Sequence, residues 1–96
     1  MKIKVKGYLT LKDLLPEQVI QIDDGIKFSL KDLLDQLTHK ADRELEETIF
    51  DTGTRNVRRE VAVLVNGSHY THIPDGLDTL LQDEDEIAIF PPIAGG

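Results

Sequence analysis

The sequence EIAIFPP, residues 86–92, decides where the fold ends. Its first five residues, Glu86–Phe90, form an apolar run that predicts a β-strand. The two prolines that follow have no N–H group to donate to a sheet, so strand pairing should stop after Phe90. We therefore expect a folded domain over residues 1–90 and an extended, flexible tail over residues 91–96, ending in Gly-Gly.

Two further strands are expected near the start of the chain. Residues 2–6 read KIKVK, which places Ile3 and Val5 on one face of a strand and the lysines on the other. A second run, residues 18–22, ends at the turn signal Asp-Asp-Gly at 23–25. The short separation of the two runs suggests an antiparallel hairpin.

The clearest helix is expected from residue 30 to about residue 40. Four leucines fall at i, i+3, i+4 and i+7, on one helical face: Leu30, Leu33, Leu34 and Leu37. Ser29 is suited to cap this helix, with Asp32 at the third helical position. A shorter helical turn is expected over residues 43–50, followed by a loop at 52–56.

The second half of the chain predicts a β-hairpin. Residues 60–65 are apolar on both faces, as in a central strand, and Asn66-Gly67 is a strong two-residue hairpin signal before a return strand at 68–71. Asp75-Gly76 marks another turn. The whole order predicts an α+β domain with a mixed sheet of about five strands, one main helix and a short second helix. The first and last strands are candidates for a parallel central pair, which is the ubiquitin-like arrangement.

Composition narrows the class of protein. The chain has 96 residues, which suits one domain, and no run approaches the roughly 20 apolar residues of a membrane helix. Without a cleavable signal pattern, a cytoplasmic protein is expected. The absence of cysteine excludes disulfides, thiolate metal sites and a cysteine nucleophile. The net charge of −7 argues against a nucleic-acid-binding surface.

The side chains of the tail become smaller toward its end. Pro91 and Pro92 favour an extended chain, and the apolar Ile93 follows. The last three residues carry almost no side chain: Ala94, Gly95 and Gly96. Glycine lets a partner approach the backbone and the terminal carbonyl closely. This gradient suits a tail threaded into a narrow partner cleft, with the Gly96 carboxylate deepest.

Several motifs resemble the small subunit of molybdopterin synthase and its relatives, the thiamine sulfur carriers and the archaeal ubiquitin-like small modifiers. They are VAVLVNG (61–67), DGLDTLL (75–81) and DEDEIAIFPPIAGG (83–96), and FSLKDLLDQL (28–37) is similar to the family's helix. GYLTLKDLLP (7–16) departs from the family's first loop. The resemblance implies a ubiquitin-like β-grasp fold.

It also implies a sulfur carrier. An E1-like adenylating enzyme would use ATP to activate the Gly96 carboxylate, and a sulfur donor would displace AMP to leave a thiocarboxylate. The molybdopterin synthase large subunit would be the partner for sulfur delivery, with residues Phe90–Gly95 as the contact segment. The carrier itself would bind no cofactor or metal and would supply no catalytic acid or base.

The sequence also fits three other functions. As a protein modifier, the chain would be joined through Gly96 to lysines of substrate proteins. As a carrier for thiamine or tRNA thiolation, it would deliver the same sulfur elsewhere. As a plain binding module, it would have an inert tail.

The remaining candidates are polar clusters. His69 and His72 would fall on opposite faces of a strand, which disfavours a shared metal, and His39 would complement a helix dipole. The acidic turn of Asp83, Glu84 and Asp85 is either solvated or a docking patch that lies beside the tail. A solvated loop face is expected for the arginines Arg55, Arg58 and Arg59.

Overall fold

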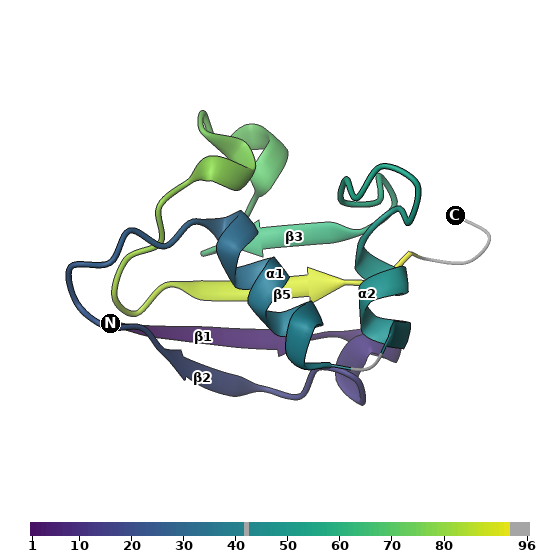
Figure 1. The fold of residues 1–96 in the computed structure, drawn as a ribbon, viewed down its shortest axis with the longest axis horizontal. Coiled ribbons are helices and arrows are strands. Elements are labelled where there is room, and N and C mark those ends of the chain that lie inside the picture. Colours follow the sequence, from purple (N-terminus) through teal and green to yellow (C-terminus); the bar gives the residue numbers. More distant parts are fainter. Residues whose placement is uncertain (42, 93–96) are drawn as a thin grey trace.

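In the computed structural model, five strands form one mixed sheet with the order β2-β1-β5-β3-β4 (Figure 1). The structure describes residues 1–41 and 43–92. The strands are β1 (Lys2–Gly7), β2 (Gln18–Gln21), β3 (Ala62–Val65), β4 (Ser68–His69) and β5 (Glu86–Phe90). The helices are α1 (Leu30–Lys40) and α2 (Arg43–Ile49), with short 3-10 turns at Leu9–Lys12, Tyr70–His72 and Gly76–Asp78.

The first and last strands lie side by side and parallel, as expected for a β-grasp. β1 pairs with β5 in the register Val5 to Ile87, while β2 pairs antiparallel on the other side of β1. β3 pairs antiparallel with the free side of β5. The closing strand is therefore the middle strand of the sheet, and the predicted hairpin of the first two strands is confirmed.

Helix α1 covers one face of this sheet (Figure 1). It begins with the predicted capping box: the Asp32 N–H donates to Ser29 Oγ at 3.1 Å, and the Ser29 N–H donates to Asp32 Oδ2 at 3.0 Å. All four leucines of the expected apolar face are buried. They pack against the strand residues that point to the same side, which include Ile3, Val5 and Ile89. No helix within residues 1–41 and 43–92 is long and apolar enough to cross a membrane.

Two details of the second hairpin differ from the prediction. β3 begins at Ala62 rather than at residue 60, and it is not buried on both faces, because Ala62 and Leu64 are only half-buried. The strand lies between β5 and the two-residue β4, so it is an interior strand of the sheet, as predicted. Nothing among the described elements covers the sheet face that Ala62 and Leu64 occupy, and we call it the open face.

The tight turn itself is confirmed. Asn66 and Gly67 both have positive φ values, 50° and 89°, as a type I′ hairpin turn requires. The return strand, however, ends at His69 instead of at residue 71. The His69 ring accepts a hydrogen bond from the Thr71 N–H at 3.2 Å, and this contact starts a 3-10 turn in place of further pairing.

Candidate functional site

The base of the tail is held from both sides. β5 ends at Phe90, as predicted, and its last pairs join Ile89 to Gly7 of β1 and Phe90 to Ala62 of β3. Pro91 is buried and Pro92 is exposed. The chain therefore leaves the domain from the middle of the sheet, where two neighbouring strands fix the direction of β5.

An aromatic pair braces this base. The rings of Tyr8 and Phe90 stack with centroids 4.5 Å apart and an interplanar angle of 12°. The Tyr8 N–H donates to the Ile89 carbonyl at 2.9 Å, so the backbone of β1 continues alongside β5 to this point. Lys6 Nζ lies 5.0 Å from the centre of the Tyr8 ring. Stacked pairs of this kind stabilise by about 0.5–1.5 kcal/mol beyond the area that they bury.

The segment that follows Tyr8 packs against the domain instead of forming a loose loop. The Gly7 N–H donates to the Leu15 carbonyl at 2.9 Å, and Leu11 and Leu15 are buried in the core. A Cβ atom on Gly7 would lie 2.8 Å from the Leu11 carbonyl oxygen and 2.9 Å from that of Leu15. Glycine is therefore required here for close packing, and the packed segment holds Tyr8 against Phe90.

Beside the base of the tail, the open face of the sheet carries an apolar patch. Its members are half-buried and come from the adjacent strands β3 and β5 and from the residue after β1: Tyr8, Ala62, Leu64, Ala88 and Phe90. Lys4 and Lys6 lie on the same face, because side chains alternate along β1 and Ile3 and Val5 point to the core. We call this set the open-face patch. Sequence reasoning missed it, although continuing the KIKVK alternation would have placed Lys6 and Tyr8 on one face.

The last four residues of the predicted site lie outside the described part of the chain: Ile93, Ala94, Gly95 and Gly96. Their roles stay predictions. Of the predicted contact segment, the structure brings Phe90 and Pro91 into the packed domain and leaves Pro92 exposed.

The acidic turn lies at the other end of β5. The Lys2 N–H donates to Asp83 Oδ1 at 2.7 Å, and Asp85 accepts hydrogen bonds from the Gln82 N–H at 2.7 Å and from Asn66 Nδ2 at 2.9 Å. The five residues of β5 lie between Asp85 and Pro91, which places the two roughly 20 Å apart at about 3.3 Å per residue.

Our expectation that the acidic charge lies beside the tail is therefore wrong, because the two lie at opposite ends of one strand. Asp83 and Asp85 close the turn instead. Partner docking by Asp83, Glu84 and Asp85 stays a prediction. The surface that they form is remote from the point where the tail leaves the domain.

The histidines are closer together than predicted. We expected the two rings on opposite faces of a strand. His72 lies in a 3-10 turn instead, and its ring centroid is 6.0 Å from that of His69. Within residues 1–41 and 43–92, no three or more His, Asp or Glu side chains are grouped as metal ligands. His39 lies in the last turn of α1, where we expected it.

Two of the three arginines do more than face solvent. Arg55 forms ion pairs with Asp35 at 3.3 Å and Glu46 at 3.5 Å, and its guanidinium lies 4.6 Å from the centre of the Phe50 ring. Arg58 Nε donates to the Glu47 carbonyl at 2.8 Å. The loop after α2 is thus tied to both helices, which the sequence pattern did not predict.

A domain with a parallel central β1–β5 pair and one covering helix has the ubiquitin-like β-grasp architecture, and its sequence continues to Gly-Gly after the central strand. Residues 3–96 match the ThiS family, and the chain belongs to this family. The resemblance drawn from the sequence motifs is therefore confirmed at the level of the family.

Individual relatives agree with this assignment. The chain is 31% identical over 98 residues to small archaeal modifier protein 3 of Haloferax volcanii, with complete coverage of both. It is 32% identical to small archaeal modifier protein 1 of Methanosarcina acetivorans, whose solution structure matches with a TM-score of 0.79 over 99% of this chain and 96% of that one.

A third solved structure shares the fold. It is a putative molybdopterin converting factor, subunit 1, from Pyrococcus furiosus, with a TM-score of 0.66 and 24% identity over 96% of this chain and 98% of that one. At that identity the likeness shows the β-grasp fold and no more.

Proposed function

We propose that this protein carries sulfur on the carboxyl group of Gly96. An E1-like partner would join this carboxylate to the AMP part of ATP and release pyrophosphate. Hydrosulfide from a sulfur donor would then attack the carbonyl carbon, the bond to the AMP oxygen would break, and a thiocarboxylate and free AMP would result. The observation that carries the proposal is the exit of the tail from the middle strand, braced by Tyr8 and Phe90.

The contribution of this chain is to present one carboxyl group. Six extended residues from Pro91 span at most roughly 18–21 Å, long enough to reach into a partner's active site while the domain stays outside. The open-face patch lies where such a partner would touch the domain, and Lys4 and Lys6 border it with positive charge. We propose that the partners supply the catalytic groups and bind the ATP.

The proposed destination of the sulfur is a pterin precursor, with this chain as the small subunit of molybdopterin synthase. The DEDEIAIFPPIAGG end, which resembles the end of the molybdopterin synthase small subunit, supports it. The test is intact mass of the protein from its native host, where one oxygen exchanged for one sulfur marks the thiocarboxylate. This form should convert a pterin precursor with the host's large subunit, and a chain lacking Gly96 should not. Thiocarboxylate that reacts only in thiamine or tRNA thiolation would contradict the molybdopterin assignment.

A second candidate is protein modification. The 31% identity to a named modifier protein over the full length favours it. In this case a substrate lysine amine attacks the activated Gly96 carbonyl and forms an isopeptide bond. The test is mass spectrometry of digested host proteins, in which modified lysines would carry a C-terminal remnant of this chain. Hosts that express the chain without Gly96 are the control, and remnant-free lysines in the wild type would exclude this fate.

A further inference from the structure

The Asn66-Gly67 turn joins β3 to β4, and both of its residues are exposed to solvent. Asparagine followed by glycine is the dipeptide most prone to deamidation, because no side chain on the second residue hinders its backbone nitrogen. That nitrogen attacks the side-chain carbonyl carbon of the asparagine and closes a five-membered ring. Around Gly67 there is open space, since a Cβ atom added there would meet no atom within 4 Å. The turn therefore has the sequence and the solvent access that this reaction requires.

The fold directs the side chain of Asn66 away from that attack. Its Nδ2 group donates to Asp85 Oδ1 at 2.9 Å, and its Oδ1 accepts from the Glu86 N–H at 2.9 Å. The Asn66 N–H also donates to the Glu86 carbonyl at 2.8 Å. We call these three hydrogen bonds the Asn66 clasp. They hold both ends of the amide toward the start of β5 instead of over Gly67.

The backbone of the turn adds a second restraint. Asn66 has a φ of 50°, and the first central residue of a type I′ turn has a ψ of about 30°. In this conformation the Gly67 nitrogen lies away from the side-chain carbonyl carbon of Asn66. Ring closure therefore requires that the side chain leave the clasp and that the backbone rotate out of the turn.

Deamidation would remove the clasp permanently. The Gly67 nitrogen displaces the amide nitrogen of Asn66, which leaves as ammonia with the proton of the Gly67 N–H. Water then opens the ring at either carbonyl and gives aspartate or isoaspartate. The product has a carboxylate where the Nδ2 donor lay, 2.9 Å from Asp85 Oδ1. Asp85 is half-buried, so salt screens the repulsion between the two carboxylates only in part.

We propose that Asn66 is a modification site that the clasp keeps unreactive, and that deamidation there releases the hairpin turn from the acidic turn. The reaction proceeds only when the hairpin opens locally, so its rate measures how often the Asn66 side chain leaves Asp85 and Glu86. The product cannot form the clasp again, and a molecule that has reacted keeps a loosened turn. The site lies at the end of β5 that is remote from the tail, and it does not depend on the proposed function.

The full chain is incubated at mildly alkaline pH, with and without guanidinium chloride, and the intact mass records the exchange of NH for O. Digestion then identifies the modified residue. We expect Asn66 to react at least about thirtyfold more slowly in the folded chain than in the unfolded chain, because two side-chain hydrogen bonds must break first. Asn56 is the internal control, since the branched side chain of Val57 hinders its backbone nitrogen in both states.

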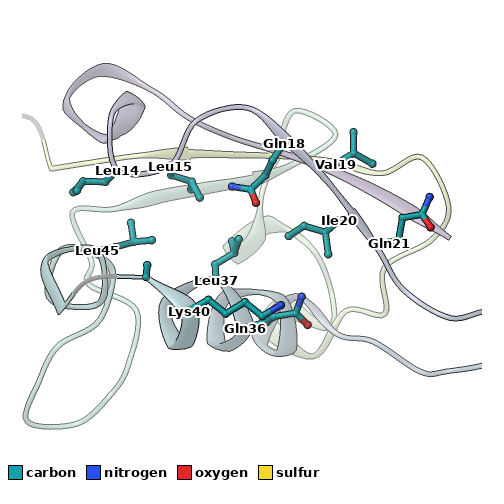
Figure 2. A pocket seen from close by; sticks show the side chains of 11 residues that line it. Leu14, Leu15, Gln18, Val19, Ile20, Gln21, Gln36, Leu37, Lys40 and Leu45 are labelled. Atoms are coloured by element: carbon teal, nitrogen blue, oxygen red, sulfur yellow. The ribbon is translucent and has the colours of Figure 1, made fainter.

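Two variants separate local opening from global unfolding. Asp85→Ala removes the acceptor for Asn66 Nδ2 and should raise the deamidation rate of the folded chain roughly five- to thirtyfold. Leu37→Ala is the matched control: Figure 2 shows Leu37 directed into the space between β2 and α1, and two strands separate β2 from β3. This variant should lower the urea midpoint at least as much as Asp85→Ala does and should leave the deamidation rate unchanged.

The effect of the product on the turn is measured with Asn66→Asp, which carries the carboxylate from the start. Its urea midpoint should lie below that of the wild type, and added salt should recover part of the loss because it screens the repulsion from Asp85. Asn66→Gly removes the side chain and suits the positive φ, so its midpoint should show no such recovery.

Equal deamidation rates in the folded and the unfolded chain would overturn the proposal, because the clasp would then give no protection. So would a rate that rises in Leu37→Ala as much as in Asp85→Ala, since global unfolding would then control the reaction. A urea midpoint of Asn66→Asp equal to that of the wild type would contradict the release of the turn.

Discussion

Replacing Gly7 by alanine tests whether the segment at 7–16 is fixed against the domain. The new Cβ would lie 2.8 Å from the Leu11 carbonyl oxygen, 2.9 Å from the Leu15 carbonyl oxygen and 2.9 Å from Leu15 Cβ. Two of these atoms belong to the backbone and cannot rotate away. The Gly7 N–H also donates to the Leu15 carbonyl, so the required shift strains that hydrogen bond.

The expected magnitude follows from these contacts. Overpacking a tight site costs about 1–3 kcal/mol, and the backbone neighbours place this site in the upper half of that range. The lower entropy of the unfolded alanine chain returns about 0.4–1 kcal/mol. A net loss of about 2 kcal/mol should lower the melting temperature by roughly 8–16 °C for a domain of this size.

The assay is thermal unfolding followed by circular dichroism, with Gly53→Ala as the matched control. A Cβ on Gly53 would meet only Asp51 Oδ1, at 3.4 Å, so this variant should melt near the wild-type temperature. Proton chemical shifts of Tyr8 and Phe90 in Gly7→Ala should also move, because their ring stacking depends on the same backbone. If Gly7→Ala melts as the control does, the segment is free to move and does not brace the base of the tail.

Three further substitutions should change the stability by smaller amounts, each through one local feature. Ser29→Ala removes the N-cap of α1 and should lower the free energy of unfolding by about 1 kcal/mol in urea titration, and an unchanged midpoint would contradict the role of the capping box. Asp85→Ala removes the acceptor for the Gln82 N–H and Asn66 Nδ2 and should cost about 1–2 kcal/mol by the same measurement. Glu84→Gln is its control, and equal losses in both would show that the turn needs acidic charge instead of these hydrogen bonds. Leu9 is 62% exposed and has a φ of 55°, so Leu9→Gly should raise stability by up to about 1 kcal/mol, and a lower melting temperature would instead show that its exposed side chain stabilises the fold.

The elements that the sequence predicted well are those specified by short-range patterns. The leucine spacing and the Ser29–Asp32 box place α1 within a residue of its observed ends. The prolines after Phe90 define the end of β5, and Asn66-Gly67 defines the hairpin turn. Each of these signals acts within a few residues, so no knowledge of the tertiary structure is needed to interpret it.

The features that the sequence did not predict depend on contacts between distant segments. Leu11 and Leu15 are buried because Gly7 permits close backbone approach. No hydrophobic periodicity in residues 7–16 predicts their burial. Arg55 finds Asp35 and Glu46 only after the two helices are in place.

The acidic turn shows how sequence proximity misleads about a site. Asp85 and Pro91 are six positions apart, but an intervening strand carries them to opposite ends of the sheet. Conversely, Tyr8 and Phe90 are far apart in sequence and stack because β1 and β5 are parallel neighbours. The end of β5 is therefore where the sequence predicted it, whereas the open-face patch was not predicted.

The central claim is that the Gly96 carboxylate is activated with ATP, whichever nucleophile then receives it. The most direct measurement is to incubate the purified chain with native-host extract, ATP and hydroxylamine, and to record its intact mass. An adenylate or thioester at Gly96 reacts with hydroxylamine, so we predict an ATP-dependent hydroxamate on the last residue and none on a chain that lacks Gly96. An unchanged mass in active extract, or the same modification in the chain without Gly96, would contradict the account.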